Sequence, residues 1–162
     1  MKLLIVGNSG SGKSTLALRQ SRSLGVKHLD LDTLAWQTDA AAPVRQALDD
    51  SALAIDAFTD GAEGWVVEGC YTDLLSLLAD KASHLVFLDL PVEDCVRNAK
   101  QRPWEPHKYA CAREQDENLP MLIRWIEQYD ERVDVFSHPA HRTFFDDFSG
   151  IKVRIQRNLS DN

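Results

Sequence analysis

Short apolar runs alternate with segments of helical periodicity along the first hundred residues. The apolar runs predict strands over residues 2–6, 26–32, 65–68 and 84–89. Between and after them, apolar residues recur at three- and four-residue spacing, which predicts helices over 13–24, 43–58, 71–81 and 92–101. Strands that alternate with helices in this way indicate an α/β fold with a parallel sheet covered by helices on both faces.

The pattern changes after residue 101. Residues 102–119 are polar and charged, contain few apolar positions and have prolines at their margins, which is typical of a loop or lid. Periodicity returns over 121–136 as an amphipathic helix, and residues 151–155 predict a fifth strand. No repeat or linker divides the chain, so we expect residues 1–162 to form a single domain.

A glycine-rich stretch separates the first strand from the first helix. Gly7-Asn-Ser-Gly-Ser-Gly-Lys13-Ser14 fits the phosphate-loop pattern G-x-x-x-x-G-K-[ST] at every fixed position. The strand before it and the helix after it favour a phosphate loop over a simple turn with an exposed lysine. We therefore expect a nucleotide to be held by Gly7, Asn8, Ser9, Gly10, Ser11, Gly12, Lys13, Ser14 and Thr15.

Two side chains of this loop have expected chemical roles. Lys13 is expected to reach the β- and γ-phosphate oxygens of ATP and to act in catalysis. The hydroxyl of Ser14 is expected to be a Mg²⁺ ligand.

Acidic residues stand at the carboxyl ends of three predicted strands. Asp30 and Asp32 end the second strand, Glu68 the third and Asp89 the fourth. Because the carboxyl ends of parallel strands face the ligand crevice, these acids are expected to converge near the phosphate loop. Asp32 is a candidate for binding the phosphoryl acceptor or taking its proton, with the alternative that one of Asp30 and Asp32 simply caps the next helix.

Two of these acids, Asp30 and Asp89, are candidates for binding Mg²⁺. Asp30 is two residues from Asp32 and would share its face of an extended strand, so one of the two could hold Mg²⁺ while the other serves the acceptor. Asp89 follows an apolar strand as Walker B acids do, although Pro91 nearby also fits a plain turn. Ser14, Asp30 and Asp89 are therefore the predicted metal ligands.

Composition narrows the classes of partner. The 162 residues carry a formal net charge of −7, which argues against general binding to nucleic acid. The apolar run at the amino terminus is too short for a signal peptide or a membrane span, so we expect a cytoplasmic protein without a membrane partner. The three cysteines form no C-x-x-C pair and are expected to be reduced.

These features together resemble a known group of proteins. The phosphate loop, Asp32 to Trp36, the run Trp65-Val-Val-Glu-Gly-Cys-Tyr71, Phe87 to Pro91 and the arginines that follow are similar to small P-loop kinases of the adenylate kinase and shikimate kinase type. Within them the chain most resembles bacterial DNA topology modulation proteins and related adenylate kinase-like proteins. The resemblance implies a P-loop NTPase fold of three layers, with a five-stranded parallel sheet in the order 2-3-1-4-5.

The resemblance also implies an acceptor-binding segment, about residues 33–64, and a lid, about residues 102–119. Lid arginines of such kinases neutralise charge during transfer, and the matching positions here are Arg97, Arg102 and Arg113; ordinary solvated arginines are the alternative. Arg45 is the candidate for an acceptor phosphate, and Asp32 and Glu68 complete the predicted substrate site. A single arginine in the acceptor segment departs from standard adenylate kinases.

The predicted function is transfer of a phosphoryl group from ATP, with Mg²⁺, to a small-molecule acceptor such as a nucleoside or nucleotide. The alternative is a regulatory ATPase that uses the nucleotide as a conformational switch. Neither the acceptor nor the oligomeric state follows from the sequence.

Overall fold

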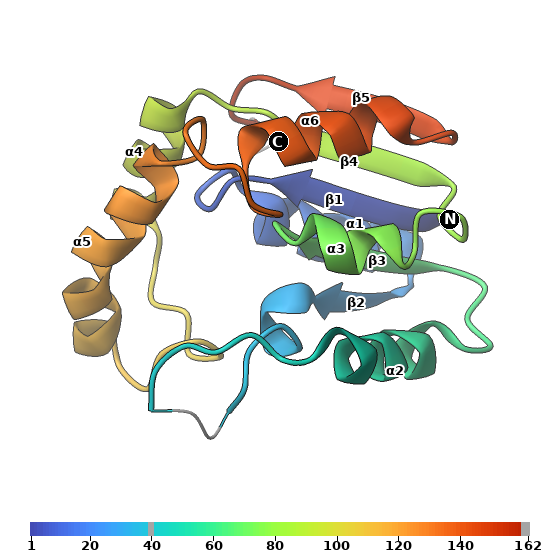
Figure 1. The fold of residues 1–162 in the computed structure, drawn as a ribbon, viewed down its shortest axis with the longest axis horizontal. Coiled ribbons are helices and arrows are strands. Elements are labelled where there is room, and N and C mark those ends of the chain that lie inside the picture. Colours follow the sequence, from blue (N-terminus) through green and yellow to red (C-terminus); the bar gives the residue numbers. More distant parts are fainter. Residues whose placement is uncertain (39–40, 160–162) are drawn as a thin grey trace.

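Within the residues that the computed structural model describes, 1–38 and 41–159, five strands form one parallel sheet in the order β2-β3-β1-β4-β5 (Figure 1). The strands are β1 (Lys2–Gly7), β2 (Lys27–Asp30), β3 (Trp65–Gly69), β4 (His84–Leu88) and β5 (Ile151–Ile155). β1 lies in the middle, with Leu4 opposite Val67 of β3 and Leu85 of β4. The predicted α/β class, the number of strands and their order are confirmed.

Helices lie on both faces of the sheet. They are α1 (Lys13–Leu24), α2 (Leu48–Thr59), α3 (Thr72–Ser76), α4 (Val92–Gln101), α5 (Ala112–Glu127) and α6 (His138–Asp147), with a short 3-10 helix η1 (Leu31–Thr33) after β2. In Figure 1, α3 and α6 lie in front of the sheet, α1 lies behind it, and α4 and α5 stand beyond the carboxyl ends of the strands.

The central strand sends alternate side chains into two separate cores. Leu4 and Val6 are fully buried in the core under α2, α3 and α6. Leu3 and Ile5 belong to the other core, under α1, α4 and α5. A strand buried on both faces reads as an unbroken apolar run, which is why the sequence predicted it correctly.

Two predicted elements near the acceptor segment need correction. The second strand ends at Asp30 and not at residue 32, because the chain turns there into η1. The helix predicted from residue 43 begins only at Leu48. The residues before it are held in an antiparallel bridge between Trp36 and Arg45, with Gln46 N donating to the carbonyl of Ala35 at 2.8 Å. This distant pairing overrides the local helical periodicity.

The region after α4 also differs from the prediction. The loop spans only residues 102–111, because α5 already begins at Ala112 and continues through Pro120. α5 ends at Glu127, so the helix predicted over 121–136 is wrong in both bounds. A further helix, α6, was missed, although Ser137 is an N-cap that accepts from Ala140 N at 3.1 Å and a proline lies in its first turn.

Of the helices in the described part of the chain, none has both the length and the apolar character needed to cross a membrane.

Candidate active site

The phosphate loop joins β1 to α1 and depends on two glycines in the left-handed region. Gly10 has φ of 76° and Gly12 of 91°, conformations that L side chains rarely adopt. A Cβ on Gly10 would also overlap the carbonyl oxygen of Cys95 in α4. The loop therefore packs its backbone against α4, and α1 starts directly at Lys13 with no side chain capping its first turn. Free backbone N–H groups at such a helix start suit an anion.

Polar contacts fix the shape of this loop. Lys13 Nζ donates to the carbonyl of Asn8 at 2.9 Å, so its ammonium group curls back over the loop. The buried amide of Asn8 donates to the carbonyl of Ile126 in α5 at 3.2 Å. Asn98 of α4 donates to the carbonyl of Gly10 at 2.9 Å. Two helices beyond the strand ends thus hold the loop in place.

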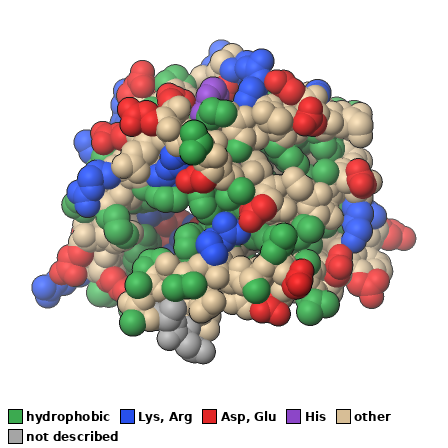
Figure 2. Space-filling model, in the orientation of Figure 1, with side chains coloured by type: hydrophobic (Ala, Val, Ile, Leu, Met, Phe, Trp, Pro, Cys, Tyr) green, Lys and Arg blue, Asp and Glu red, His purple; other side chains and the backbone are tan. Residues whose placement is uncertain are grey.

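A cavity of about 1030 Å³ opens next to the loop, between the strand ends and residues 101–109. Figure 2 shows the surface hollowed on the side of the molecule where α5 lies. The cavity is lined by many of the predicted site residues: Ser9, Gly10, Ser11, Gly12, Lys13, Ser14, Thr15, Asp30, Asp32, Glu68 and Arg102. The structure therefore brings together the phosphate loop, three strand-end acids and one of the three predicted lid arginines.

Oxygen atoms suited to Mg²⁺ lie where the loop meets β3. Ser14 Oγ donates to Glu68 Oε1 at 2.7 Å, and the Glu68 side chain is only 1% exposed. Asp30 is the direct neighbour of Glu68 in the β2–β3 register. Hydroxyl and carboxylate oxygens are the donors that Mg²⁺ prefers, commonly with one or two carboxylates and the phosphates of a nucleotide. Ser14, Glu68 and Asp30 therefore fit a Mg²⁺ bound together with nucleotide.

A lysine from the loop after α4 contacts both acids at the end of β2. Lys108 Nζ lies 2.9 Å from Asp32 Oδ2 and 3.5 Å from Asp30 Oδ2. Glu105, in the same loop, is 3.8 Å from that ammonium group. Asp30 also accepts from Asp32 N at 2.9 Å, which makes it the cap of η1. Of the two aspartates considered as a helix cap, Asp30 is therefore the one that takes this role.

The pKa values of the two neighbouring aspartates, Asp30 and Asp32, are shifted in opposite directions. Burial, reinforced by the charges of Glu68 and Asp32, raises the pKa of Asp30 to about 6. Burial would also raise the pKa of Asp32, but the charge of Lys108 and a hydrogen bond from Tyr71 outweigh it and lower this pKa. Asp32 is thereby kept as a carboxylate, while Asp30 retains its proton to a higher pH than an ordinary aspartate.

A tyrosine anchors Asp32 from the far side. Tyr71 OH donates to Asp32 Oδ1 at 2.5 Å and accepts from Trp36 Nε1 at 2.8 Å. Tyr71 is buried, and burial, with the charges of Cys70 and Asp32, raises the pKa of its hydroxyl. The tyrosine is therefore a permanent donor to this carboxylate.

Asp89 does not line the cavity. Its carboxylate binds Arg154 of β5, with Nε at 2.7 Å, and His138 Nε2 at 2.9 Å. These two partners occupy both of its oxygens and tie β4 to β5 and α6. Within the described residues, no three His, Cys, Asp or Glu side chains gather into a group that could hold a metal ion. The structure therefore gives no support to Asp89 as a partner of Ser14 and Asp30.

The remaining predicted residues also lie outside the cavity lining. Arg45 pairs with Asp73 at 2.9 Å. Arg97 pairs with Asp94 at 2.6 Å on α4, and Arg113 is exposed and pairs with Glu117 at 2.8 Å on α5. Gly7 and Asn8 form the base of the phosphate loop behind the lining. Among the predicted arginines only Arg102 faces the cavity, where it pairs with Glu105 at 2.9 Å.

Three residues of the site, Lys108, Glu105 and Tyr71, were not predicted from the sequence. Lys108 and Glu105 lie in a polar segment that was singled out only for its arginines, and the lysine's spacing from Asp32 carries no local signal. Tyr71 had a weak sequence signal, because it lies three residues after Glu68, close to the carboxyl end of a strand, and these ends face the ligand crevice.

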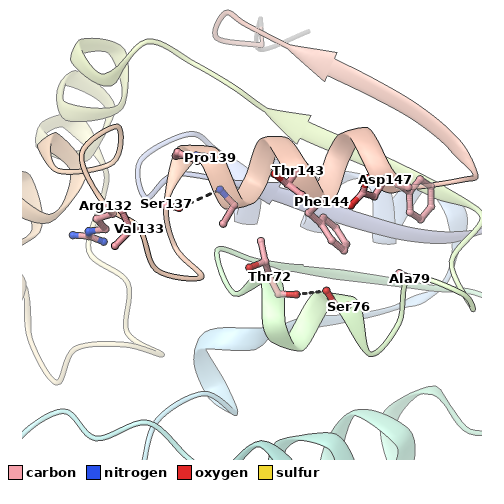
Figure 3. A pocket seen from close by; sticks show the side chains of 12 residues that line it. Thr72, Ser76, Ala79, Arg132, Val133, Ser137, Pro139, Thr143, Phe144 and Asp147 are labelled. Atoms are coloured by element: carbon pink, nitrogen blue, oxygen red, sulfur yellow. Dashed lines mark hydrogen bonds between the residues drawn. The ribbon is translucent and has the colours of Figure 1, made fainter.

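A second cavity, of about 600 Å³, lies away from this site between α3 and α6 (Figure 3). Its hydroxyl groups are already used within the fold: Ser76 Oγ donates to the carbonyl of Thr72 at 2.6 Å, and Ser137 Oγ accepts from Ala140 N. Its lining contains no residue of the phosphate loop and none of the acids at the strand ends, so we place the functional site at the larger cavity.

Comparison with known proteins supports the fold assignment. No family model matches the chain. A relative from Bacillus subtilis (strain 168), the uncharacterized protein YqaC, is 25% identical over 98% of this chain and 89% of its own length. Shikimate kinase from Acinetobacter baumannii, solved in complex with shikimate, has a TM-score of 0.58 at 17% identity, covering 98% of this chain and 84% of that one. The chain shares the fold of that kinase.

Proposed function

We propose that the protein transfers the γ-phosphoryl group of ATP to a hydroxyl group of a small molecule. The observation that carries this proposal is that one cavity is lined both by the phosphate loop and by Asp32, which is held as a carboxylate. A carboxylate that shares the cavity with the phosphate loop can take the proton of an acceptor hydroxyl, which supports phosphoryl transfer over nucleotide binding alone. The fold, shared with a kinase that binds a small molecule, agrees with this function.

The donor is bound by the loop. Backbone N–H groups from Ser9 to Thr15 and the ammonium group of Lys13 would hold the phosphates, once Lys13 Nζ leaves the carbonyl of Asn8. Ser14, Glu68 and Asp30 would hold Mg²⁺, which supplies positive charge to the β- and γ-phosphate oxygens.

In the transfer step, the acceptor hydroxyl oxygen forms a bond to the γ-phosphorus as the bond from that phosphorus to the bridging oxygen breaks. ADP leaves with the electron pair of the broken bond. The hydroxyl proton passes to the carboxylate of Asp32, which returns it to water afterwards. Arg102 is the one predicted lid arginine that lines the cavity, and it would neutralise charge on the transferring group.

The loop over residues 102–111 acts as the lid in this proposal, and the segment over 33–64 as the acceptor-binding region. Lys108 ties the lid to Asp32 before substrates bind, so acceptor entry requires this ion pair to open. A nucleoside or nucleotide is the proposed class of acceptor.

An ADP-release assay tests the proposal. ATP and Mg²⁺ are supplied with a panel of nucleosides, nucleoside monophosphates and sugars, and the rate is compared with that in water alone. We expect at least one acceptor to accelerate ADP release and to be recovered with an added phosphate. A rate that no acceptor changes would show instead a regulatory ATPase that hydrolyses ATP slowly.

A further inference from the structure

The acceptor half of the cavity is strongly acidic. Asp30, Asp32 and Glu68 from the strand ends and Glu105 from the lid all line it. Only 10% of the Asp30 side chain and 1% of the Glu68 side chain are exposed, so water screens their charges poorly. This half of the cavity therefore repels an anion.

The cations in this half are already paired with these acids. Lys108 contacts Asp32, Asp30 and Glu105 through one ammonium group. Arg102 pairs with the other oxygen of Glu105, Oε2. The remaining lysine and arginine of the lining, Lys13 and Arg19, belong to the loop and α1, where the phosphates of the donor would lie, and His28 and His107 also line the cavity. Within the described residues, four acids thus line the acceptor half beside one lysine and one arginine, and two of these acids, Asp30 and Glu68, would share the Mg²⁺ of the donor.

Arg45, the arginine of the acceptor segment, is directed elsewhere. Its guanidinium group donates to Asp73 and to the carbonyl of Ala35. It also lies 5.1 Å from the ring centre of Tyr71 and 5.2 Å from that of Phe136. Aromatic rings and a carboxylate therefore enclose this charge outside the cavity, where it cannot grip an acceptor phosphate.

We infer that the acceptor is an alcohol without a phosphate or carboxylate group, either neutral or cationic. The inference rests on the proposed function and narrows its substrate. The donor adds to the same effect, because ATP with one Mg²⁺ brings a net negative charge into the cavity. An anionic acceptor would have to be desolvated beside Asp32, Glu105 and a polyphosphate, and it could pair only with a Lys108 or Arg102 that is already paired with a carboxylate.

The test compares acceptors in matched pairs that differ only by an anionic group: nucleosides with their monophosphates, ribose with ribose phosphate, and methyl shikimate with shikimate. ADP release with ATP and Mg²⁺ gives kcat/KM for each. We expect the uncharged member to be preferred by about tenfold or more. Preference for the anionic members overturns the inference and leaves the proposed function standing. If no compound accelerates ADP release, the proposed function fails, and the inference fails with it.

A charge variant sharpens the result. Glu105→Gln keeps the size of the side chain but releases Arg102 and Lys108 from one carboxylate. The ratio of anionic to neutral kcat/KM is expected to rise several-fold in this variant. Glu117→Gln on α5, whose partner Arg113 is exposed, is the matched control and is expected to leave the ratio unchanged. An unchanged ratio in Glu105→Gln, with the fold intact by circular dichroism, contradicts the inference.

Discussion

The two halves of the cavity are built in different ways. The donor half is one continuous stretch of chain, Gly7 to Thr15, whose shape comes from glycines and from the strand and helix on either side. The acceptor half collects side chains from β2, β3 and the lid, with Lys108 reaching Asp32 across 76 residues of sequence. A local motif can therefore define what the first half binds, whereas the second half is defined only by the folded chain.

The halves also differ in charge. The donor half offers backbone N–H groups and Lys13, which suit a polyphosphate. The acceptor half offers carboxylates, of which Asp32 is held ionised by Lys108 and Tyr71. In the proposed function, this polarity directs the triphosphate to one side and leaves the other for an alcohol. The variants below test each half separately.

The largest effect is expected from Lys13→Ala. Loss of the ammonium group removes the charge that meets the β- and γ-phosphates, so ATP turnover should fall about a hundredfold or more. Steady-state ADP release measures it. Lys81→Ala is the control, since Lys81 pairs with Asp56 on the exposed surface. Retained turnover in Lys13→Ala would overturn the assignment of the donor half.

Backbone shape in the donor half is tested by Gly10→Ala against Gly61→Ala. Both glycines have positive φ, 76° and 63°, but a Cβ on Gly61 meets nothing within 4 Å. Gly61→Ala should therefore cost only the strain of the left-handed region, about 1–2 kcal/mol. Gly10→Ala adds the overlap with the carbonyl of Cys95 and should cost about 3 kcal/mol or more in urea unfolding. Equal costs would show that the loop does not pack against α4.

In the acceptor half, Tyr71→Phe removes one hydrogen bond from Asp32. Because the hydroxyl stabilises the ionised form, its loss should raise the pKa of Asp32. Carbon NMR of the carboxyl groups across a pH titration measures the change, and ATP affinity should stay the same. Tyr129→Phe is the control, because its hydroxyl contacts His141 and not the cavity. If the pKa of Asp32 does not change in Tyr71→Phe, Tyr71 has no role in positioning Asp32.

The smallest effect concerns the pH dependence of stability. The pKa of Asp30 is about 6 in the fold and 3.8 as its ordinary value, so the folded state binds the extra proton between these values. The contribution of Asp30 to stability is therefore fully present below about pH 4 and falls as pH rises through 6.

Asp30→Asn removes that dependence. Relative to that of the natural chain, the free energy of unfolding of the variant should rise by about 2 kcal/mol from pH 4 to pH 8. Urea unfolding at each pH measures this change. Asp80→Asn, on the exposed surface, is the control. If the gain in the free energy of unfolding is the same at both pH values, the surroundings of Asp30 do not raise its pKa.

Local signals in the sequence were enough for most of the fold. The buried strands were predicted from their apolar runs, and α1 from its periodicity and from Gly25, which ends it in a left-handed conformation. Errors arose where distant residues decide. The bridge between Trp36 and Arg45 delays α2, and Pro120, taken as a boundary, lies inside α5.

Part of the site could likewise be predicted from local signals in the sequence. The phosphate loop and the strand-end acids Asp30, Asp32 and Glu68 follow from motif and topology, because parallel strands present their carboxyl ends together. Arg45 and Asp89 look the same in sequence whether they face the cavity or a partner such as Asp73 or Arg154. Side-chain packing decides which partner each of these residues contacts, and the spacing of residues in the sequence does not predict it.

We propose that Asp32 serves the acceptor and not the nucleotide, and Asp32→Asn separates these two roles. With an acceptor identified by the ADP-release assay, transfer and ATP binding are measured on the same variant in the presence of Mg²⁺. We expect kcat for transfer to fall about a hundredfold or more, while the Kd for ATP stays within about twofold. An equal loss of transfer and of ATP affinity would contradict this role and would place Asp32 with the donor half.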